Sequence, residues 1–415
     1  MGAMEARRGG LAWIAALAVG WAALAALGYR SRDPDSRLYA EIAAAMSTAP
    51  AAGWIAPDFP PGWFMAGRFR EHPAGLFVPA ALLARLGYPA DEAAYALNAL
   101  YQALTLLLLP KLAAHLLPGL ESRALGWLMQ LLPIAFTYRI RANHEQAVVL
   151  CLLVALLGTE RSRRSPGWAA LTAAGLVGLL LVKGLFAVFG PLLCALWLLA
   201  RCRDRARPDH SEPAAWAGLV VAVVAMGGAA ALYEVLYRQA TGEPFWSLYV
   251  SRQLGVAAAF GPGGAMVEEG LQKGSNLVWY AGRVLWFAFP WSLTLLAAAA
   301  SRWPSGKRDA HPAAPPAERS AAAGAAAFVA GATLVYLGVF SLADRRADRY
   351  IFPVYYLVGS AGAAVALGRW PRFRRLAAAL DRPWVPAVMW CLALLLHPVA
   401  GRLGVPTIKL WPPRS

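Results

Sequence analysis

The chain's first long apolar run reads LAWIAALAVGWAALAALG, from Leu11 to Gly28. Its length is close to the roughly 20 residues that a helix needs to cross the hydrocarbon core of a bilayer. The run contains no charged residue, so a helix here can lie in lipid without burying a charge. Comparable runs recur along the whole chain, which predicts a polytopic membrane protein.

The composition agrees with this prediction. Of the 415 residues, 59% are hydrophobic and 15% are charged, against about 25% charged in a typical soluble protein. We expect an all-α fold of about eleven transmembrane helices in a single domain over residues 1–415. The expected spans are centred on Leu11–Gly28, Ala93–Leu109, Ala124–Tyr138, Ala147–Leu157, Trp168–Val182, Leu185–Ala200, Ala214–Leu236, Leu277–Ala300, Ala321–Phe340, Tyr350–Leu367 and Val385–Ala400.

Arginine-rich loops set the orientation of these spans. RSRR at Arg161–Arg164, RCRDRAR at Arg201–Arg207, RWPSGKR at Arg302–Arg308 and RWPRFRR at Arg369–Arg375 fall on one side of the membrane. Basic loops favour the cytoplasmic side of a membrane, so these loops predict which side is the cytoplasm. They also account for the net charge of +16, and we expect no nucleic-acid partner. The outer side then holds a long first loop over 29–92 and a second long loop over 237–276, and 301–320 is a cytoplasmic linker.

Several cations oppose the rule that basic loops face the cytoplasm, because they lie in very short outer turns. They are Arg139, Arg141, Lys183, Arg345, Arg346 and Arg349. Cations there work against insertion, so we expect an anionic ligand at the outer boundary to require them. The alternative is that they pair with Glu145, Asp344 and Asp348, or face phospholipid headgroups.

A compact acidic cluster follows the first span. Asp33 and Asp35 are followed by Leu38, Ile42 and Met46 at helical spacing. One interpretation makes Asp35 the N-cap of a helix that lies on the membrane surface over Ser36–Ser47. The other gives its carboxylate a chemical role.

The order of short motifs favours the chemical role. DSRLYAEIA at Asp35–Ala43 is followed by WIAP at Trp54–Pro57 and FREHPAG at Phe69–Gly75. LVKGL at Leu181–Leu185 and RYIFP at Arg349–Pro353 come later. Together they resemble the C-type superfamily of membrane glycosyltransferases, above all the lipid A aminoarabinose transferase and protein O-mannosyltransferase-like family. The resemblance extends from about Leu11 to Tyr356 and is most specific in the first outer loop.

The resemblance implies a sugar transferase of the bacterial inner membrane whose active site faces the periplasm. The donor would be a sugar linked to polyprenyl phosphate, and the acceptor a glycolipid, a glycan or a protein. An aspartate would accept the proton of the acceptor hydroxyl, and basic residues would stabilise the departing phosphate. The sugar carbon would be inverted.

Individual roles follow from the matched motifs. With Tyr39 as the anchor, Asp35 aligns with the catalytic aspartate. The family's second outer loop corresponds to Pro133–Glu145 here, and Glu145 is the best candidate for its acidic residue. The residues expected to hold the donor phosphate are Arg37, Arg70, His72, Arg139, Arg141, Lys183, Arg346, Arg349 and Tyr350. Asp33, Glu71 and His144 are expected nearby.

Two departures from the family pattern affect these assignments. His72 stands where the family has a lysine, so Arg70 could take its role, or His72 could be charged beside Glu71. The family's arginine aligns with Leu38, one place past Arg37.

Asp33 and Asp35 also form a D-x-D pair of the kind that holds a divalent metal in oligosaccharyltransferases, but we expect no metal and no cofactor.

Two other functions stay open at this level. A transporter or flippase of lipid-linked sugars would keep ionisable residues near the bilayer midplane, whereas here charge gathers on the outer face. A non-catalytic member of the same fold is the second alternative.

For the transferase we expect a second surface helix over about Pro73–Leu86 and an outward-facing cavity covered by the two long outer loops.

Overall fold

The computed structural model describes residues 2–27, 31, 33–63, 65–116, 123–201, 211–257, 266–300, 316–343, 346–380, 382 and 384–397. Regular structure in these residues is helical, which confirms the expected all-α class. The α-helices are α1 (Gly2–Leu27), α2 (Pro34–Thr48), α3 (Ala51–Ile55), α4 (Val78–Arg85), α5 (Ala93–Leu116), α6 (Arg123–Leu128), α7 (Pro133–Thr137), α8 (Glu145–Ser162), α9 (Ala169–Lys183), α10 (Phe189–Arg201), α11 (Glu212–Thr241), α12 (Phe245–Ala257), α13 (Met266–Phe287), α14 (Trp291–Ala300), α15 (Pro316–Ser341), α16 (Phe352–Arg369), α17 (Pro371–Ala379) and α18 (Val385–Leu395). Short 3₁₀ helices are η1 (Ala74–Leu76), η2 (Met129–Leu131), η3 (Pro166–Trp168), η4 (Gly184–Val188) and η5 (Asp348–Ile351).

The expected count of eleven membrane crossings is not confirmed. Six helical stretches of the described chain are long and apolar enough to cross a bilayer, or up to seven if one bent pair counts as a span. These stretches are fewer than eleven because other expected spans are shorter or carry charge. Among these, α18 is an 11-residue helix, and α8 contains Glu145, Glu160 and Arg161.

The apolar stretch Pro166–Arg201 folds back on itself at Gly184, where φ is +56°. The α8 and α9 backbones touch where glycine leaves room: a Cβ on Gly175 would lie 2.5 Å from the Ala155 nitrogen. From the turn, α10 runs back to the far end of α8, where Arg201 lies 3.3 Å from Glu160. The hairpin therefore holds Lys183 at the tip of two adjacent helices.

One expected span is wrong in detail. The single helix predicted over Leu277–Ala300 is two helices, α13 and α14, bent by 110°. Pro290 lies in the break, and proline has no N–H with which to continue a helix. The bend brings α14 against α16 so closely that a Cβ on Gly362 would lie 2.0 Å from the Trp291 carbonyl oxygen.

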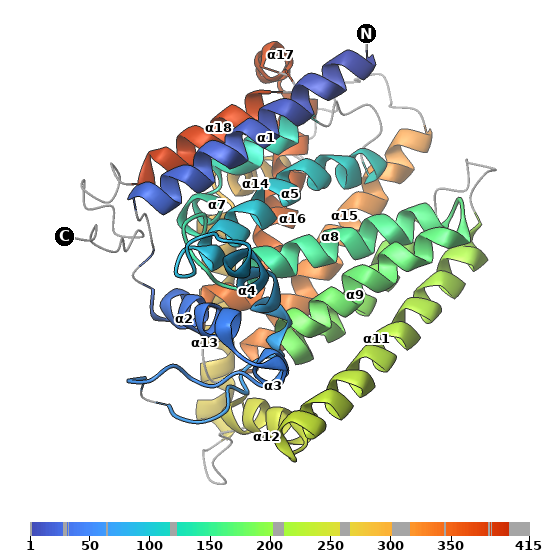
Figure 1. Ribbon diagram of the computed structural model, residues 1–415. Helices are drawn as coiled ribbons and strands as arrows, with labels where there is room; N and C mark the ends of the chain where they lie inside the picture. Colours follow the sequence, from blue (N-terminus) through green and yellow to red (C-terminus); the bar gives the residue numbers. More distant parts are fainter. Residues whose placement is uncertain are drawn as a thin grey trace.

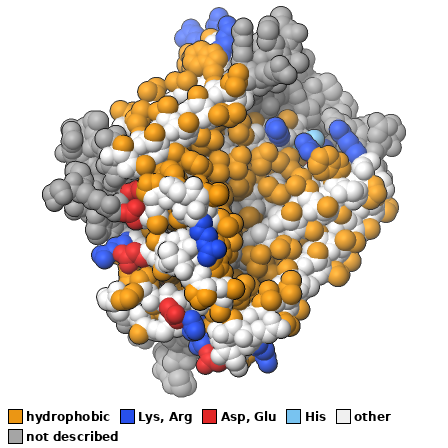
Figure 2. All heavy atoms as spheres, viewed as in Figure 1, with side chains coloured by type: hydrophobic (Ala, Val, Ile, Leu, Met, Phe, Trp, Pro, Cys, Tyr) orange, Lys and Arg blue, Asp and Glu red, His pale blue; other side chains and the backbone are white. Residues whose placement is uncertain are grey.

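Long helices form the body of the molecule, and the shorter helices α2, α3 and α12 gather at one end of it. Figure 1 shows α8, α9 and α11 side by side, α1 beside α18, and α2, α3 and α12 at the lower left. In Figure 2 a broad hydrophobic band crosses this face, and charged side chains lie at the lower left, over the short elements, and near the upper-right ends of the helices. This distribution is that of a multi-span membrane protein.

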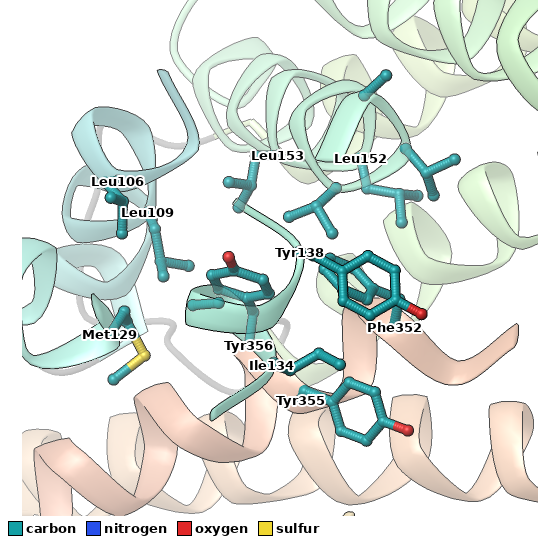
Figure 3. Close-up of a cluster of buried hydrophobic side chains, with 14 of the residues drawn as sticks. Leu106, Leu109, Met129, Ile134, Tyr138, Leu152, Leu153, Phe352, Tyr355 and Tyr356 are labelled. Atoms are coloured by element: carbon teal, nitrogen blue, oxygen red, sulfur yellow. The ribbon is translucent and has the colours of Figure 1, made fainter. Parts of the chain in front are cut away.

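Aromatic and aliphatic side chains fill the core beneath the short elements. Figure 3 shows Tyr138, Phe352 and Tyr356 among leucines of α5 and α8. The rings of Tyr138 and Phe352 are 4.8 Å apart, and Phe352 is fully buried. This packing fixes the turn after α7 against the start of α16, and both segments supply residues to the site described next.

The two predicted surface helices are present at this end. The helix expected over Ser36–Ser47 is α2, and the one expected over Pro73–Leu86 is η1 followed by α4. Residues 202–210, 258–265 and 301–315 lie outside the described residues, and with them most of the expected linker and part of the second outer loop.

Candidate active site

Asp33, not Asp35, caps α2. The Asp33 carboxylate accepts a hydrogen bond from the Ser36 backbone N–H at 3.2 Å, and Pro34 occupies the first helical position, where its missing N–H costs nothing. The interpretation of Asp35 as the N-cap is therefore wrong. Asp35 lies in the first turn of α2, and its carboxylate pairs with Arg349.

Several bonds join the start of the first outer loop to the short outer turn over 139–145. The Ser31 N–H donates to the Ile140 carbonyl at 3.1 Å, and the Ser36 hydroxyl donates to the Asn143 side-chain oxygen. Arg141 Nη1 lies 3.8 Å from the Asp33 carboxylate. These contacts hold Asp33 and Asp35 against a segment that lies about 100 residues further along the chain.

Three acid–base pairs form what we call the outer rim: Asp35 with Arg349, Asp33 with Arg141, and Asp348 with Arg283. The Arg283 Nε lies 3.0 Å from Asp348 Oδ1. Their side chains are between 19% and 38% exposed, so the rim is reachable from solvent. An anion that enters the rim would compete with the carboxylates for the arginines.

Beneath the rim lies a second group, which we call the buried layer: Tyr39, His72, His144, Glu145 and Lys183. The Tyr39 hydroxyl lies 2.9 Å from His72 Nε2, and the His72 and His144 rings are 4.7 Å apart. His144 Nε2 is 3.0 Å from Glu145 Oε1, and both side chains are at most 2% exposed. The layer thus joins α2, the FREHPAG segment, the start of α8 and the tip of α9.

The surroundings of His72 disfavour its charged form. Burial lowers the pKa of His72 well below its ordinary value, and the neighbouring His144 and Lys183 lower it further. A neutral imidazole is a weaker phosphate ligand than an ammonium. Lys183 is the one lysine or arginine among the five residues of the buried layer.

The position of Lys183 is fixed by α12. The Tyr249 hydroxyl accepts a hydrogen bond from the Leu185 N–H at 3.1 Å and donates to the Lys183 carbonyl at 3.2 Å. A Cβ on Gly184 would lie 2.4 Å from that hydroxyl oxygen. Glycine at this turn is therefore required both by its positive φ and by the approach of Tyr249.

The described part of the second outer loop covers the first. Arg252 on α12 lies 3.4 Å from the Glu71 carboxylate, and Gln253 donates to the Glu71 carbonyl at 3.3 Å. The Tyr233 hydroxyl donates to the Ile55 carbonyl at 2.9 Å. Burial raises the pKa of Glu71, and Arg252 opposes that rise.

Some predicted phosphate ligands lie elsewhere. Arg37 pairs with Glu41 at 2.7 Å. Arg70 pairs with Glu243 and donates to the Tyr237 hydroxyl. Arg346 donates to Asn276 at 2.5 Å, and Tyr350 stacks on Phe340 with ring centroids 5.2 Å apart. These contacts place the four side chains beside the site or on its margin.

Arg139 lies deeper, away from both groups. Its side chain is fully buried, where Nε donates to the Gln102 side chain at 2.9 Å and Nη1 donates to the Trp390 carbonyl at 3.3 Å. The adjacent Arg141 is the residue of this turn that reaches the rim.

The sequence did not single out several residues of the site. Ser36 and Asn143 join the loops, Tyr249 fixes the turn at Lys183, and Arg283 completes the rim. Arg283 lies inside an apolar run, and an arginine there is a signal of a partner that the sequence interpretation passed over. The others have no spacing signal, because their partners are distant in the chain.

Within the described residues, no group of three or more His, Cys, Asp or Glu side chains could hold a metal ion. Metal independence stays a prediction. A narrow pocket behind Tyr39 is lined by Leu76, Phe77, Asn98, Tyr101 and Asn143, among others.

No protein-family model and no curated protein sequence matches the chain. Solved structures do match. ArnT from Cupriavidus metallidurans bound to undecaprenyl phosphate aligns with a TM-score of 0.61 and 16% identity over 94% of this chain and 77% of that one. Its apo form aligns at 0.56 and 18% over 94% and 64%. A weaker likeness, at 0.44 and 11% over 98% and 60%, is to an oligosaccharyltransferase of Archaeoglobus fulgidus.

The two ArnT alignments show that this chain has the fold of ArnT. The predicted resemblance is therefore confirmed at the level of the fold. ArnT is thus one solved protein to which the chain is similar in fold, and the chain spans 64% of the apo ArnT chain.

Proposed function

We propose that this protein transfers a sugar from a polyprenyl-phosphate donor to an acceptor hydroxyl, with inversion, on the periplasmic side of a bacterial inner membrane. The observation that carries the proposal is the connection of the outer rim, which contains Asp35 and Arg349, to the buried layer that contains Lys183: the Ser36 hydroxyl beside Asp35 donates to Asn143, the residue before His144. A carboxylate and several cations at one end of an apolar bundle suit a lipid-linked phosphate. The solved ArnT of the same fold binds undecaprenyl phosphate.

The reaction needs one base and one phosphate site. The acceptor oxygen attacks the sugar's anomeric carbon, and its proton passes to the Asp35 carboxylate. The bond between that carbon and the phosphate oxygen breaks, and the electron pair leaves with the polyprenyl phosphate. Arg349, Arg141 and Lys183 stabilise the charge that develops on the leaving group.

Without a bound donor, Asp35 must separate from Arg349 before it can act as the base. Asp35 is paired with Arg349, so its carboxylate is engaged by a guanidinium and not by an acceptor hydroxyl. A donor phosphate that binds Arg349 takes over that partner and releases Asp35 to the acceptor hydroxyl. Donor binding would therefore precede productive acceptor binding.

Glu145 has a different role in this scheme from the catalytic one expected of it. Its carboxylate is buried and lies beside His144, out of reach of an acceptor. We assign it as a positioning residue that keeps His144 in place and balances the charge of Lys183.

The test uses purified full-length protein with a radiolabelled pool of polyprenyl-phosphate sugars from the source membrane. Wild type is expected to release sugar from the lipid, and Asp35→Asn to lose about 10²–10⁴-fold in rate while expressing normally. Ser47→Ala, a substitution on the same helix, serves as the matched control. Equal release by wild type and Asp35→Asn would overturn the proposed base.

Other outcomes separate the alternatives. Release that EDTA abolishes would replace the metal-free mechanism with a metal site at Asp33 and Asp35. Movement of intact sugar-lipid across vesicle membranes, unchanged in Asp35→Asn, would replace the transferase with a flippase. Tight donor binding with no release in the presence of membrane acceptors would indicate a non-catalytic member of the fold.

A further inference from the structure

The segment between α16 and α18 carries a dense group of arginines that the proposed reaction does not use. Residues 369–384 contain five arginines and, in sequence, one acidic residue, Asp381. The arginines are Arg369, Arg372, Arg374, Arg375 and Arg382, and all five are exposed. Most of this segment forms the helix α17.

This helix lies at the end of the molecule opposite the outer rim. The 3₁₀ helix η5, which carries Asp348 and Arg349 of the rim, leads directly into α16. The 18 residues of α16 extend about 27 Å away from the rim, which is close to the thickness of a bilayer core. Figure 1 shows α17 at the periphery of the bundle, far from α3 and α12.

The two sides of α17 differ in chemistry. Ala377 is buried, and Phe373 packs against Trp291 with ring centroids 5.6 Å apart. Beside this attachment, Leu376 and Leu380 are 55% and 38% exposed. At helical spacing, Arg372, Arg374 and Arg375 lie on the remaining arc, and none of these three forms an ion pair with a described residue.

One tryptophan precedes α17 in the sequence and another follows it. Trp370 and Trp384 are 43% and 49% exposed at its two ends, and tryptophan is enriched at membrane–water boundaries. A short helix with an apolar flank, a basic face and terminal tryptophans has the pattern of a helix that lies in the plane of the membrane surface.

We propose that α17 binds the headgroups of acidic phospholipids at the cytoplasmic boundary. Leu376 and Leu380 would contact the acyl chains, and Arg372, Arg374 and Arg375 would contact the headgroup phosphates. Charge complementarity selects this partner, because unpaired guanidiniums next to an apolar surface match an anionic lipid and not a zwitterionic one.

Native mass spectrometry of the full chain in detergent tests the proposal. The protein is titrated with phosphatidylglycerol and, separately, with phosphatidylcholine of the same acyl chains. Wild type is expected to retain phosphatidylglycerol preferentially. Replacement of Arg372, Arg374 and Arg375 by Gln should lower that affinity at least about tenfold, whereas replacement of all three by Lys should largely preserve it.

A matched triple variant distinguishes this site from the general positive charge of the cytoplasmic side. Lys111→Gln, Arg161→Gln and Arg164→Gln together remove the same charge from other helix ends and should leave lipid retention within about twofold. Equal losses in the two Gln variants, equal retention of both lipids by wild type, or displacement of phosphatidylglycerol by millimolar inorganic phosphate would each overturn the proposal.

Discussion

Asp35 in the first turn of α2 and Arg349 in the 3₁₀ helix before α16 form an ion pair, although more than 300 residues separate them in the chain. Both side chains remain about one third exposed. The pair therefore lies where a ligand can reach it, and it joins two of the short motifs on which the family resemblance rests. In the proposed reaction these two residues separate, one toward the acceptor and one toward the donor phosphate.

Arg349→Gln should lower the rate of sugar release by about 10²-fold or more, because it removes a charged donor that faces the leaving phosphate. Arg349→Lys should recover part of this loss, since it keeps the charge but not the planar fork. The measurement is release from labelled donor at several donor concentrations.

The matched control for Arg349 is Arg37→Gln. Arg37 is 53% exposed and pairs with Glu41 one turn along α2, a type of contact worth about 0.3–0.5 kcal/mol. Its replacement should change the rate less than about twofold. A loss at Arg37 as large as that at Arg349 would contradict the placement of the phosphate at the rim.

Asp33 should tolerate asparagine better than alanine. Asparagine can accept the Ser36 N–H as aspartate does, whereas alanine cannot, and loss of an N-cap costs about 0.5–2 kcal/mol. The apparent melting temperature in detergent should therefore fall for Asp33→Ala and stay near wild type for Asp33→Asn. If both variants keep the wild-type melting temperature, the cap contributes nothing to stability.

His72 makes stability depend on pH. Its pKa is lower in the folded protein than in the unfolded chain, so below the ordinary histidine pKa the unfolded chain binds more protons. The folded state then loses stability as the pH falls from about 7.5 to about 5.5. His72→Gln removes this contribution, and its melting temperature should fall less over that range. His144 is present in both proteins and provides a common background, so identical pH dependence would refute the assignment.

Hydropathy predicted the helical class and the long apolar helices α1, α5, α11, α15 and α16 well, because a run of about 20 apolar residues has few alternatives to a spanning helix. It missed the 110° bend between α13 and α14, since Pro290 is itself apolar and lies inside a run that reads as one span. Backbone geometry, not hydropathy, decides such a break.

Motif order predicted a site with Asp35, Lys183 and Arg349, of which Asp35 and Arg349 form an ion pair, but it could not say where the other cations point. Arg70 faces Glu243, and Arg139 faces Gln102. Those partners come from distant segments, so the direction of each arginine depends on tertiary contacts that no local spacing encodes. The cap at Asp33 was missed for a smaller reason: two aspartates lie two residues apart, and the proline between them decides which one begins the helix.

Tyr249→Phe should destabilise the turn that carries Lys183. The change removes a hydroxyl that accepts from the Leu185 N–H and donates to the Lys183 carbonyl. The Leu185 N–H is partly buried, so leaving it without a partner costs less than the about 1–3 kcal/mol of a fully buried group. The apparent melting temperature should fall, and the donor concentration needed for half-maximal release should rise, because Lys183 is less firmly placed.

Tyr336→Phe is the matched control for Tyr249, since the Tyr336 hydroxyl is also buried but has no hydrogen-bond partner among the described residues. Its removal should leave the melting temperature unchanged or raise it, because an unpaired buried hydroxyl costs free energy. The contrast between the two phenylalanine variants isolates the two hydrogen bonds at the turn from the loss of a ring hydroxyl in general. Equal shifts in both proteins would mean that α12 covers the site without fixing Lys183, and Lys183 would then have to be placed by the donor itself.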